Sequence, residues 1–106
     1  MVRALINCPK TAKKGEVIEI KTLISHVMET GYRPGADGKV VPRDILRRFT
    51  CRYAGQEVFS ADLFPAIAAN PFISFTTVAT ASGTLSFTWD GDNGFTQTET
   101  VAITVT

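Results

Sequence analysis

The stretch T-L-S-F-T-W at residues 84–89 alternates large apolar side chains with hydroxyl-bearing ones. A period of two predicts a β-strand with one face in a core and the other in solvent. Leu85, Phe87 and Trp89 would form the buried face. This is the most regular pattern in the chain, and it predicts a protein built from sheets.

Turn signals flank this strand, and further strands are predicted on both sides of it. Ser82 and Gly83 precede it, and D-G-D-N-G follows at residues 90–94, so both ends suit hairpin turns. The other predicted strands are residues 4–7, 16–24, 45–53, 57–64 and 72–79, with a last strand through Val101, Ile103 and Val105. Two irregularities stand out: Thr22 is polar on an apolar face, and Arg47 interrupts another.

Segments with helical periodicity are nearly absent. Residues 54–56 form a short turn that predicts a hairpin. Residues 63–71 are bracketed by prolines and are expected to cross between sheets with about one helical turn. About seven short antiparallel strands in a chain of 106 residues predict an all-β, immunoglobulin-like β-sandwich, with a single domain over residues 1–106.

Charge and hydropathy narrow the classes of partner. Eleven Lys and Arg against ten Asp and Glu give a net charge of +1, which supplies no field for gathering nucleic acid. No run approaches the roughly 18 apolar residues that a membrane helix needs. The first residues, M-V-R-A-L-I-N-C-P, show no secretory signal. We therefore expect neither nucleic-acid nor membrane binding.

His26 is the single histidine, and it lies two residues before Met28. A blue-copper site needs two histidines and a cysteine, so this chain does not fit that class. The simpler interpretation is that His26 closes a strand end and bonds a loop carbonyl, while Met28 packs. We expect no metal and no cofactor, and a small metal or redox protein using His26 and Met28 remains the alternative.

Two other features suggest a functional site, a calcium loop and a reactive cysteine, but neither matches the requirements of such a site. The loop at residues 90–94 resembles the start of a calcium loop, but Phe95 and Val101 occupy the positions where an EF-hand needs glycine and glutamate. Cys51 falls on the apolar face of a predicted strand, where burial makes a thiol inert, and Cys8 lies beside a strand. A disulfide between them is left open, and no catalytic residue is predicted.

Arginines gather near the predicted strand at residues 45–53. Such a cluster either forms a solvated face or holds an anion or an acidic partner through its guanidinium groups. Its members are Arg43, Arg47, Arg48 and Arg52.

Four motifs in order resemble the SoxZ family of the thiosulfate-oxidising Sox system. They occupy residues 9–33, 37–49, 59–72 and 87–95, and include His-x-Met-Glu-Thr-Gly at residues 26–31 followed by the Asp-Gly-Lys turn at 37–39. The resemblance runs from about Ala4 to Val105. It agrees with the sandwich predicted from the strand pattern.

The resemblance implies a non-catalytic subunit. Its expected partner is a SoxY-type subunit whose C-terminal Gly-Gly-Cys-Gly-Gly arm carries covalent sulfur intermediates, and other Sox enzymes are expected as transient partners. It also implies a periplasmic location, so without a visible signal this chain would be exported already bound to its partner. An accessory binding domain with no sulfur role is a further alternative.

Residues 25–33 resemble a family loop that we expect to shape a binding surface. Exposed aromatic and arginine side chains on loops often anchor interfaces. A lasting heterodimer also predicts an exposed apolar patch on the isolated chain. The predicted partner-binding residues are His26, Met28, Tyr32, Arg33, Asn70, Phe72 and Phe95.

Overall fold

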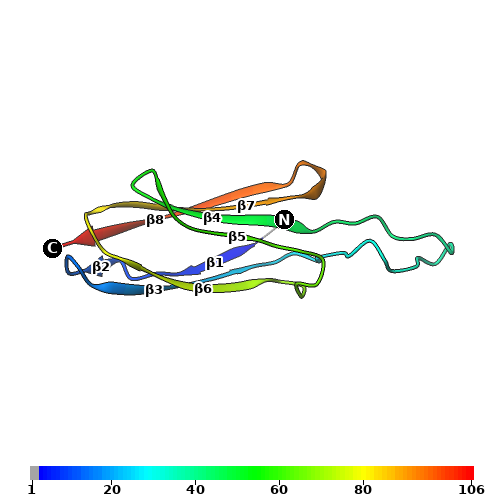
Figure 1. Ribbon diagram of the computed structural model, residues 1–106, viewed down its shortest axis with the longest axis horizontal. Helices are drawn as coiled ribbons and strands as arrows, with labels where there is room; N and C mark the ends of the chain where they lie inside the picture. The colour runs from blue at the N-terminus through cyan, green and yellow to red at the C-terminus, as the bar shows by residue number, and fades with distance from the viewer. Residues whose placement is uncertain (1–2) are drawn as a thin grey trace.

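The computed structural model describes residues 3–106 and places eight strands in two sheets (Figure 1). The strands are β1 (Ala4–Asn7), β2 (Thr11–Ala12), β3 (Val17–Ile24), β4 (Leu46–Tyr53), β5 (Gln56–Asp62), β6 (Phe72–Val78), β7 (Gly83–Gly91) and β8 (Thr96–Val105). A short 3-10 helix, η1 (Asp92–Gly94), joins β7 to β8. The β-sandwich predicted from the alternation is confirmed.

The two sheets divide the strands unequally. One has the order β1-β3-β6, and the other has the order β2-β8-β7-β4-β5. All pairings are antiparallel except that of β2 with β8, which is parallel. The chain leaves one sheet after β1 and joins the edge of the other at β2. A two-residue strand is too short to show a period, which explains why seven strands were predicted.

The core lies between the sheets and is centred on aromatic residues. Leu85, Phe87 and Trp89 are fully buried, as their alternation predicted. Phe49 packs 5.2 Å from the ring of Trp89, centroid to centroid. Phe59 stacks on a ring of the opposite sheet at 4.3 Å and thereby ties β5 to β6.

The irregular positions have local explanations. The pairing of β4 with β7 shifts register between Leu46 and Arg48, so Arg47 sits in a bulge and turns outward. Thr22 is buried, and its hydroxyl donates to the carbonyl of Ile73 at 3.1 Å. The helical turn expected within residues 63–71 is absent, and this segment forms only turns and bends. Its prolines lack the N–H that a helix requires.

Residues 29–44 form a two-armed ribbon that projects from the end of the sandwich (Figure 1). At its base, Glu29 and Asp44 exchange two backbone hydrogen bonds of 2.8 Å. Nearer its tip, Pro34 pairs with Val40, and the predicted turn at residues 37–39 closes the end. The ribbon contributes to a long, narrow molecule of 59 × 20 × 20 Å. Within residues 3–106, no helix has the length and apolar character to cross a membrane.

Candidate partner-binding surface

His26 is buried at the base of the ribbon, and both of its ring nitrogens face protein groups. Nδ1 accepts a hydrogen bond from the backbone N–H of Met28 at 3.0 Å. Nε2 lies 3.8 Å from a carboxylate oxygen of Asp44, and the ring meets Phe95 edge-on with centroids 5.4 Å apart. The sequence predicted that His26 bonds a loop carbonyl, and for its ring this prediction is wrong. His26 orders the chain where the ribbon begins.

Met28 and Asn70 complete this base. Met28 is buried with a positive φ of 50°, and its sulfur accepts the N–H of Leu46 at 3.3 Å. The Asn70 side chain accepts the His26 N–H at 2.9 Å, and the Asn70 N–H donates to the His26 carbonyl at 2.8 Å. The structure thus gathers His26, Met28, Asn70 and Phe95 into one cluster, whose visible contacts are internal.

Tyr32 and Arg33 lie on the ribbon itself. The Tyr32 side chain is among the most exposed large groups, at 80%. Arg33 donates to Glu29 from two nitrogens, the shorter contact being 2.7 Å. These hydrogen bonds hold the pKa of the Glu29 carboxyl below its usual value. One side of the Arg33 guanidinium is thereby engaged, while Tyr32 stands free of the sandwich.

Asp92 fastens the other end of the ribbon, a role that the sequence did not predict for it. Its carboxylate accepts two hydrogen bonds from Arg43, at 2.8 and 2.9 Å, and one from the Ile45 N–H at 3.2 Å. Arg47 approaches it to 3.5 Å. The acidic turn that resembled a calcium loop binds arginines in this structure.

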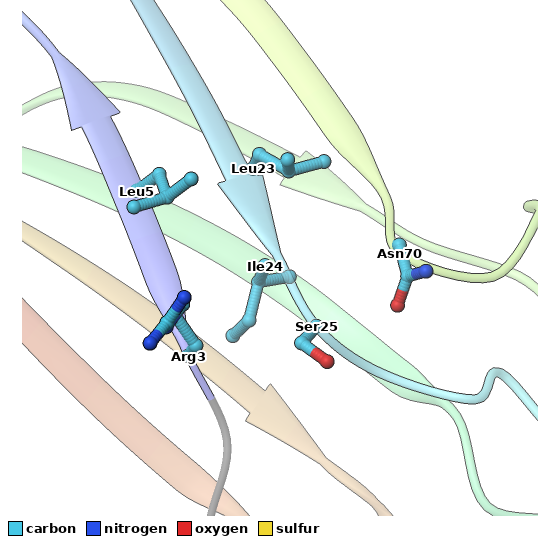
Figure 2. A pocket seen from close by; sticks show the side chains of 6 residues that line it. All are labelled: Arg3, Leu5, Leu23, Ile24, Ser25 and Asn70. Atoms are coloured by element: carbon cyan, nitrogen blue, oxygen red, sulfur yellow. The ribbon is translucent and has the colours of Figure 1, made fainter.

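Phe72 lies apart from the ribbon, on the outward face of the three-stranded sheet. It stands beside Leu23, which in turn stands beside Leu5, in one row across the three strands. Leu5 and Leu23 also line a hollow beside this row, together with Asn70 and neighbouring residues (Figure 2), and its volume is about 160 Å³. The sequence carried a signal for Leu23, because it is apolar and follows Glu19 and Lys21 on the outward face of its strand.

Neither cysteine has the environment of a reactive thiol. Cys51 is fully buried, and burial, with a smaller effect from Cys8, raises its pKa to about 12. Cys8 is partly buried, which raises its pKa as well, and its sulfur lies 3.5 Å from the Pro9 carbonyl oxygen. Both are free thiols. Within the described residues 3–106, no three His, Cys, Asp or Glu side chains gather as metal ligands would.

Solved structures share the fold at low sequence identity. Superoxide reductase (neelaredoxin) from Ignicoccus hospitalis has 14% identity and a TM-score of 0.70, covering 97% of this chain and 80% of that chain. The sulfur carrier protein SoxY from Chlorobium limicola has 14% identity and a TM-score of 0.66, covering 96% and 74%. A CARDB domain from Pyrococcus furiosus reaches 12% and 0.54, covering 100% and 94%. These likenesses support the sandwich fold.

Sequence comparison gives the family. No curated protein sequence matches the chain. A family model described as "Sulphur oxidation protein SoxZ" matches residues 6–102, which is nearly the whole chain. The match agrees with the order of motifs in the sequence, and the chain belongs to the SoxZ family.

Proposed function

We propose that this protein is the non-catalytic, non-thiol subunit of a two-subunit sulfur carrier. It pairs with a SoxY-type subunit, whose C-terminal cysteine arm holds the sulfur intermediates of thiosulfate oxidation. The observation that carries the proposal is the SoxZ match over residues 6–102. The family supports a periplasmic site of action.

The state of the cysteines supports this division of labour. A carrier thiol must leave its own domain to enter the active sites of several enzymes, which calls for an exposed cysteine on a flexible, glycine-rich tether. Cys51 lies inside the five-stranded sheet, and Cys8 follows β1 directly. The attacking species would be a thiolate, which burial disfavours at both positions. The carrier thiol is therefore assigned to the partner.

The geometry of His26 and Met28 gives no support to the metal or redox alternative. The lone pair of Nδ1 is used by the Met28 N–H, so a neutral ring carries its proton on Nε2, facing Asp44. The Met28 sulfur receives the Leu46 N–H. The two donor atoms that a soft metal would use are engaged within the protein.

The ribbon is our candidate surface for transient contacts with other Sox enzymes. It projects from the sandwich and carries Tyr32 at its exposed side, and amphipathic aromatic side chains of this kind often anchor interfaces. Arg33 and Tyr32 would act there directly. His26, Met28, Asn70 and Phe95 would act by holding the ribbon base in place.

The test is to co-express the chain with the SoxY-type subunit of the same organism and to purify the complex by size exclusion. Intact masses of both subunits are then recorded before and after thiosulfate-dependent turnover. We expect a 1:1 heterodimer with sulfur adducts on the partner alone. No complex, or an adduct on Cys8 or Cys51, would overturn the proposal.

A second measurement addresses the ribbon. Tyr32→Ala should leave the heterodimer intact and lower the turnover rate at limiting concentrations of the Sox enzymes. Val58→Ala, at another exposed apolar side chain outside the ribbon, is the matched control. Equal turnover by the two variants would remove the ribbon from the proposal and leave the carrier role standing.

A further inference from the structure

The outward face of the three-stranded sheet carries a continuous apolar row. Leu5 on β1 pairs with Leu23 on β3, and Leu23 pairs with Phe72 on β6. Their side chains are 56%, 37% and 60% exposed. Directly opposed residues of neighbouring strands lie about 5 Å apart, so the three side chains form one patch rather than scattered contacts. We call it the outer row.

Two hollows open along the outer row. One, of about 160 Å³, is lined by Leu5, Leu23 and Asn70 among others (Figure 2). The second, of about 220 Å³, is lined by Leu5, Leu23 and Phe72 among others. Leu23 thus stands between two recesses large enough for side chains of another protein. Side chains of a partner can enter such recesses, which increases the area in contact.

The opposite face of the sandwich has a different character. The outward positions of β7 and β8 are mainly hydroxyl-bearing, and Thr88 and Thr98 share a hydrogen bond of 3.0 Å. Of the eleven large apolar side chains found exposed in residues 3–106, five lie on the outward face of the three-stranded sheet. They are Leu5, Val17, Leu23, Phe72 and Val78. Among residues 3–106, this sheet face therefore exposes more large apolar side chains than the outward face of β7 and β8 does.

We propose that the SoxY-type subunit docks on the outer row, an inference that rests on the proposed function. The SoxY structure shares this two-sheet fold over 96% of the chain, so the partner is itself expected to present a sheet face. Sheets pack face to face about 10 Å apart with interdigitating side chains. Leu23 and the two hollows beside it suit that arrangement. The partner face is therefore predicted to be apolar as well.

The area of the sheet face is too small for a stable interface with the SoxY-type subunit by itself. The three strands have four, eight and seven residues, so the sheet covers at most roughly 15 by 25 Å, whereas a stable complex buries about 800 Å² on each partner. The face alone falls short, so the contact must extend beyond it. Val27 is 66% exposed and continues the outward alternation of β3 toward the ribbon. The interface is accordingly placed over the outer row and the ribbon base.

The test compares single arginine substitutions on the two faces. Leu23→Arg and Phe72→Arg place a charge in the outer row, and Thr100→Arg places the same charge on the exposed face of β8. Affinity for the SoxY-type subunit is measured by titration calorimetry, after melting curves establish that each variant folds. We expect Leu23→Arg to raise Kd at least 100-fold and Thr100→Arg to change it less than threefold.

Hydroxyl-radical footprinting of the wild-type heterodimer gives a reading that needs no variant. Leu5, Leu23 and Phe72 should be oxidised much less in the complex than in the free chain, while the oxidation of Val58 should not change.

A heterodimer with unprotected outer-row residues, or with affinity unchanged by Leu23→Arg, overturns this inference and leaves the carrier role intact. Failure of the wild-type chains to pair overturns the carrier role instead. A homodimer of this chain that persists beside the partner would assign the outer row to self-association and also overturn the inference.

Discussion

Arg43 and Asp92 are 49 positions apart in sequence and are joined by two parallel hydrogen bonds, Nε to Oδ2 at 2.8 Å and Nη2 to Oδ1 at 2.9 Å. This paired geometry is among the stronger arrangements of arginine and carboxylate. It links the returning arm of the ribbon to the turn between β7 and β8. The position of the ribbon thus depends on a side chain that is distant in sequence but lies at the same end of the sandwich (Figure 1).

Replacing Asp92 by Asn should therefore loosen the ribbon and lower the melting temperature at neutral pH. The hydrogen bonds from Arg43 hold the pKa of Asp92 below the value of about 3.9 in an unfolded chain. A depressed carboxyl pKa stabilises the fold above the unfolded value, and the contribution is lost as pH falls through the folded-state pKa. The difference in melting temperature between wild type and Asp92→Asn should accordingly narrow below about pH 4.

Asp62→Asn is the matched control for this experiment. Its carboxylate pairs with Arg48 at 2.7 Å but is 63% exposed, and exposed ion pairs contribute little. A loss of melting temperature as large as that of Asp92→Asn would indicate a general effect of charge and contradict the anchoring role.

Gly31 and Gly38 offer a second pair of matched variants within the ribbon. Both have positive φ, at 89° and 79°, so an alanine at either position is strained by about 1 kcal/mol. A Cβ at Gly31 would also lie 2.9 Å from the Cβ of Arg43, whereas at Gly38 it would meet nothing within 4 Å. Gly31→Ala should be the more damaging change.

Amide hydrogen exchange at the ribbon base measures the difference in local stability between Gly31→Ala and Gly38→Ala. The N–H groups of Glu29 and Asp44 are bonded across the ribbon base, so their exchange reports its opening. We expect both to exchange faster in Gly31→Ala than in Gly38→Ala. Equal rates would show that the close approach of residues 31 and 43 has no bearing on ribbon stability.

The strands were predictable because apolar and polar residues alternate along a strand that has one buried face. β1 was placed with its observed limits, and β3 and β6 to within one residue. The ribbon was not predictable, since residues 29–44 bury little and show no alternation. Its form depends on backbone bonds such as those between Glu29 and Asp44, which no local pattern encodes.

The candidate site was predictable only in part, for a related reason. The sequence distinguishes a charged side chain from an apolar one but does not say which residue it meets. Asp92 could be recognised as acidic but not as the partner of Arg43, and His26 as a strand-end residue but not as an acceptor for Met28. Leu23 could have been found from its strand alone, because it is apolar at an outward position that follows two charged ones, Glu19 and Lys21.

The hairpin between β4 and β5 is predicted to carry removable strain. Ala54 and Gly55 both have positive φ, at 50° and 82°, as a type I′ turn requires. Asparagine tolerates this conformation better than alanine, so Ala54→Asn should raise the free energy of unfolding by about 1 kcal/mol. Urea denaturation checks this, with Ala66→Asn, on an exposed loop without positive φ, expected to stay within about 0.5 kcal/mol of wild type.

Removing the Tyr53 hydroxyl should lower the free energy of unfolding more than removing any other hydroxyl. This hydroxyl donates to the Ala81 carbonyl, and the hydroxyl oxygen accepts the N–H groups of Thr80 and Ala81, each at 3.3 Å. Tyr53→Phe leaves these backbone groups without their partner, which should cost about 1–3 kcal/mol of unfolding free energy. Tyr32→Phe, at an 80% exposed position, should cost almost nothing, and equal losses in the two variants would contradict the assignment.

The cysteines give a prediction that bears on the carrier role directly. Because the pKa of Cys51 is raised to about 12, almost none of it is thiolate at pH 8, and iodoacetamide should leave it unmodified in the folded protein. Cys8 should react more slowly than a free cysteine, and both should react fully in urea. A raised thiol pKa stabilises the fold below the unfolded value of about 8.5 and loses that effect as pH rises toward 12, so stability should fall across this alkaline range. Rapid modification of Cys51 in the folded chain would expose a reactive thiol where the structure has a core residue, and it would reopen the question of which subunit carries the sulfur.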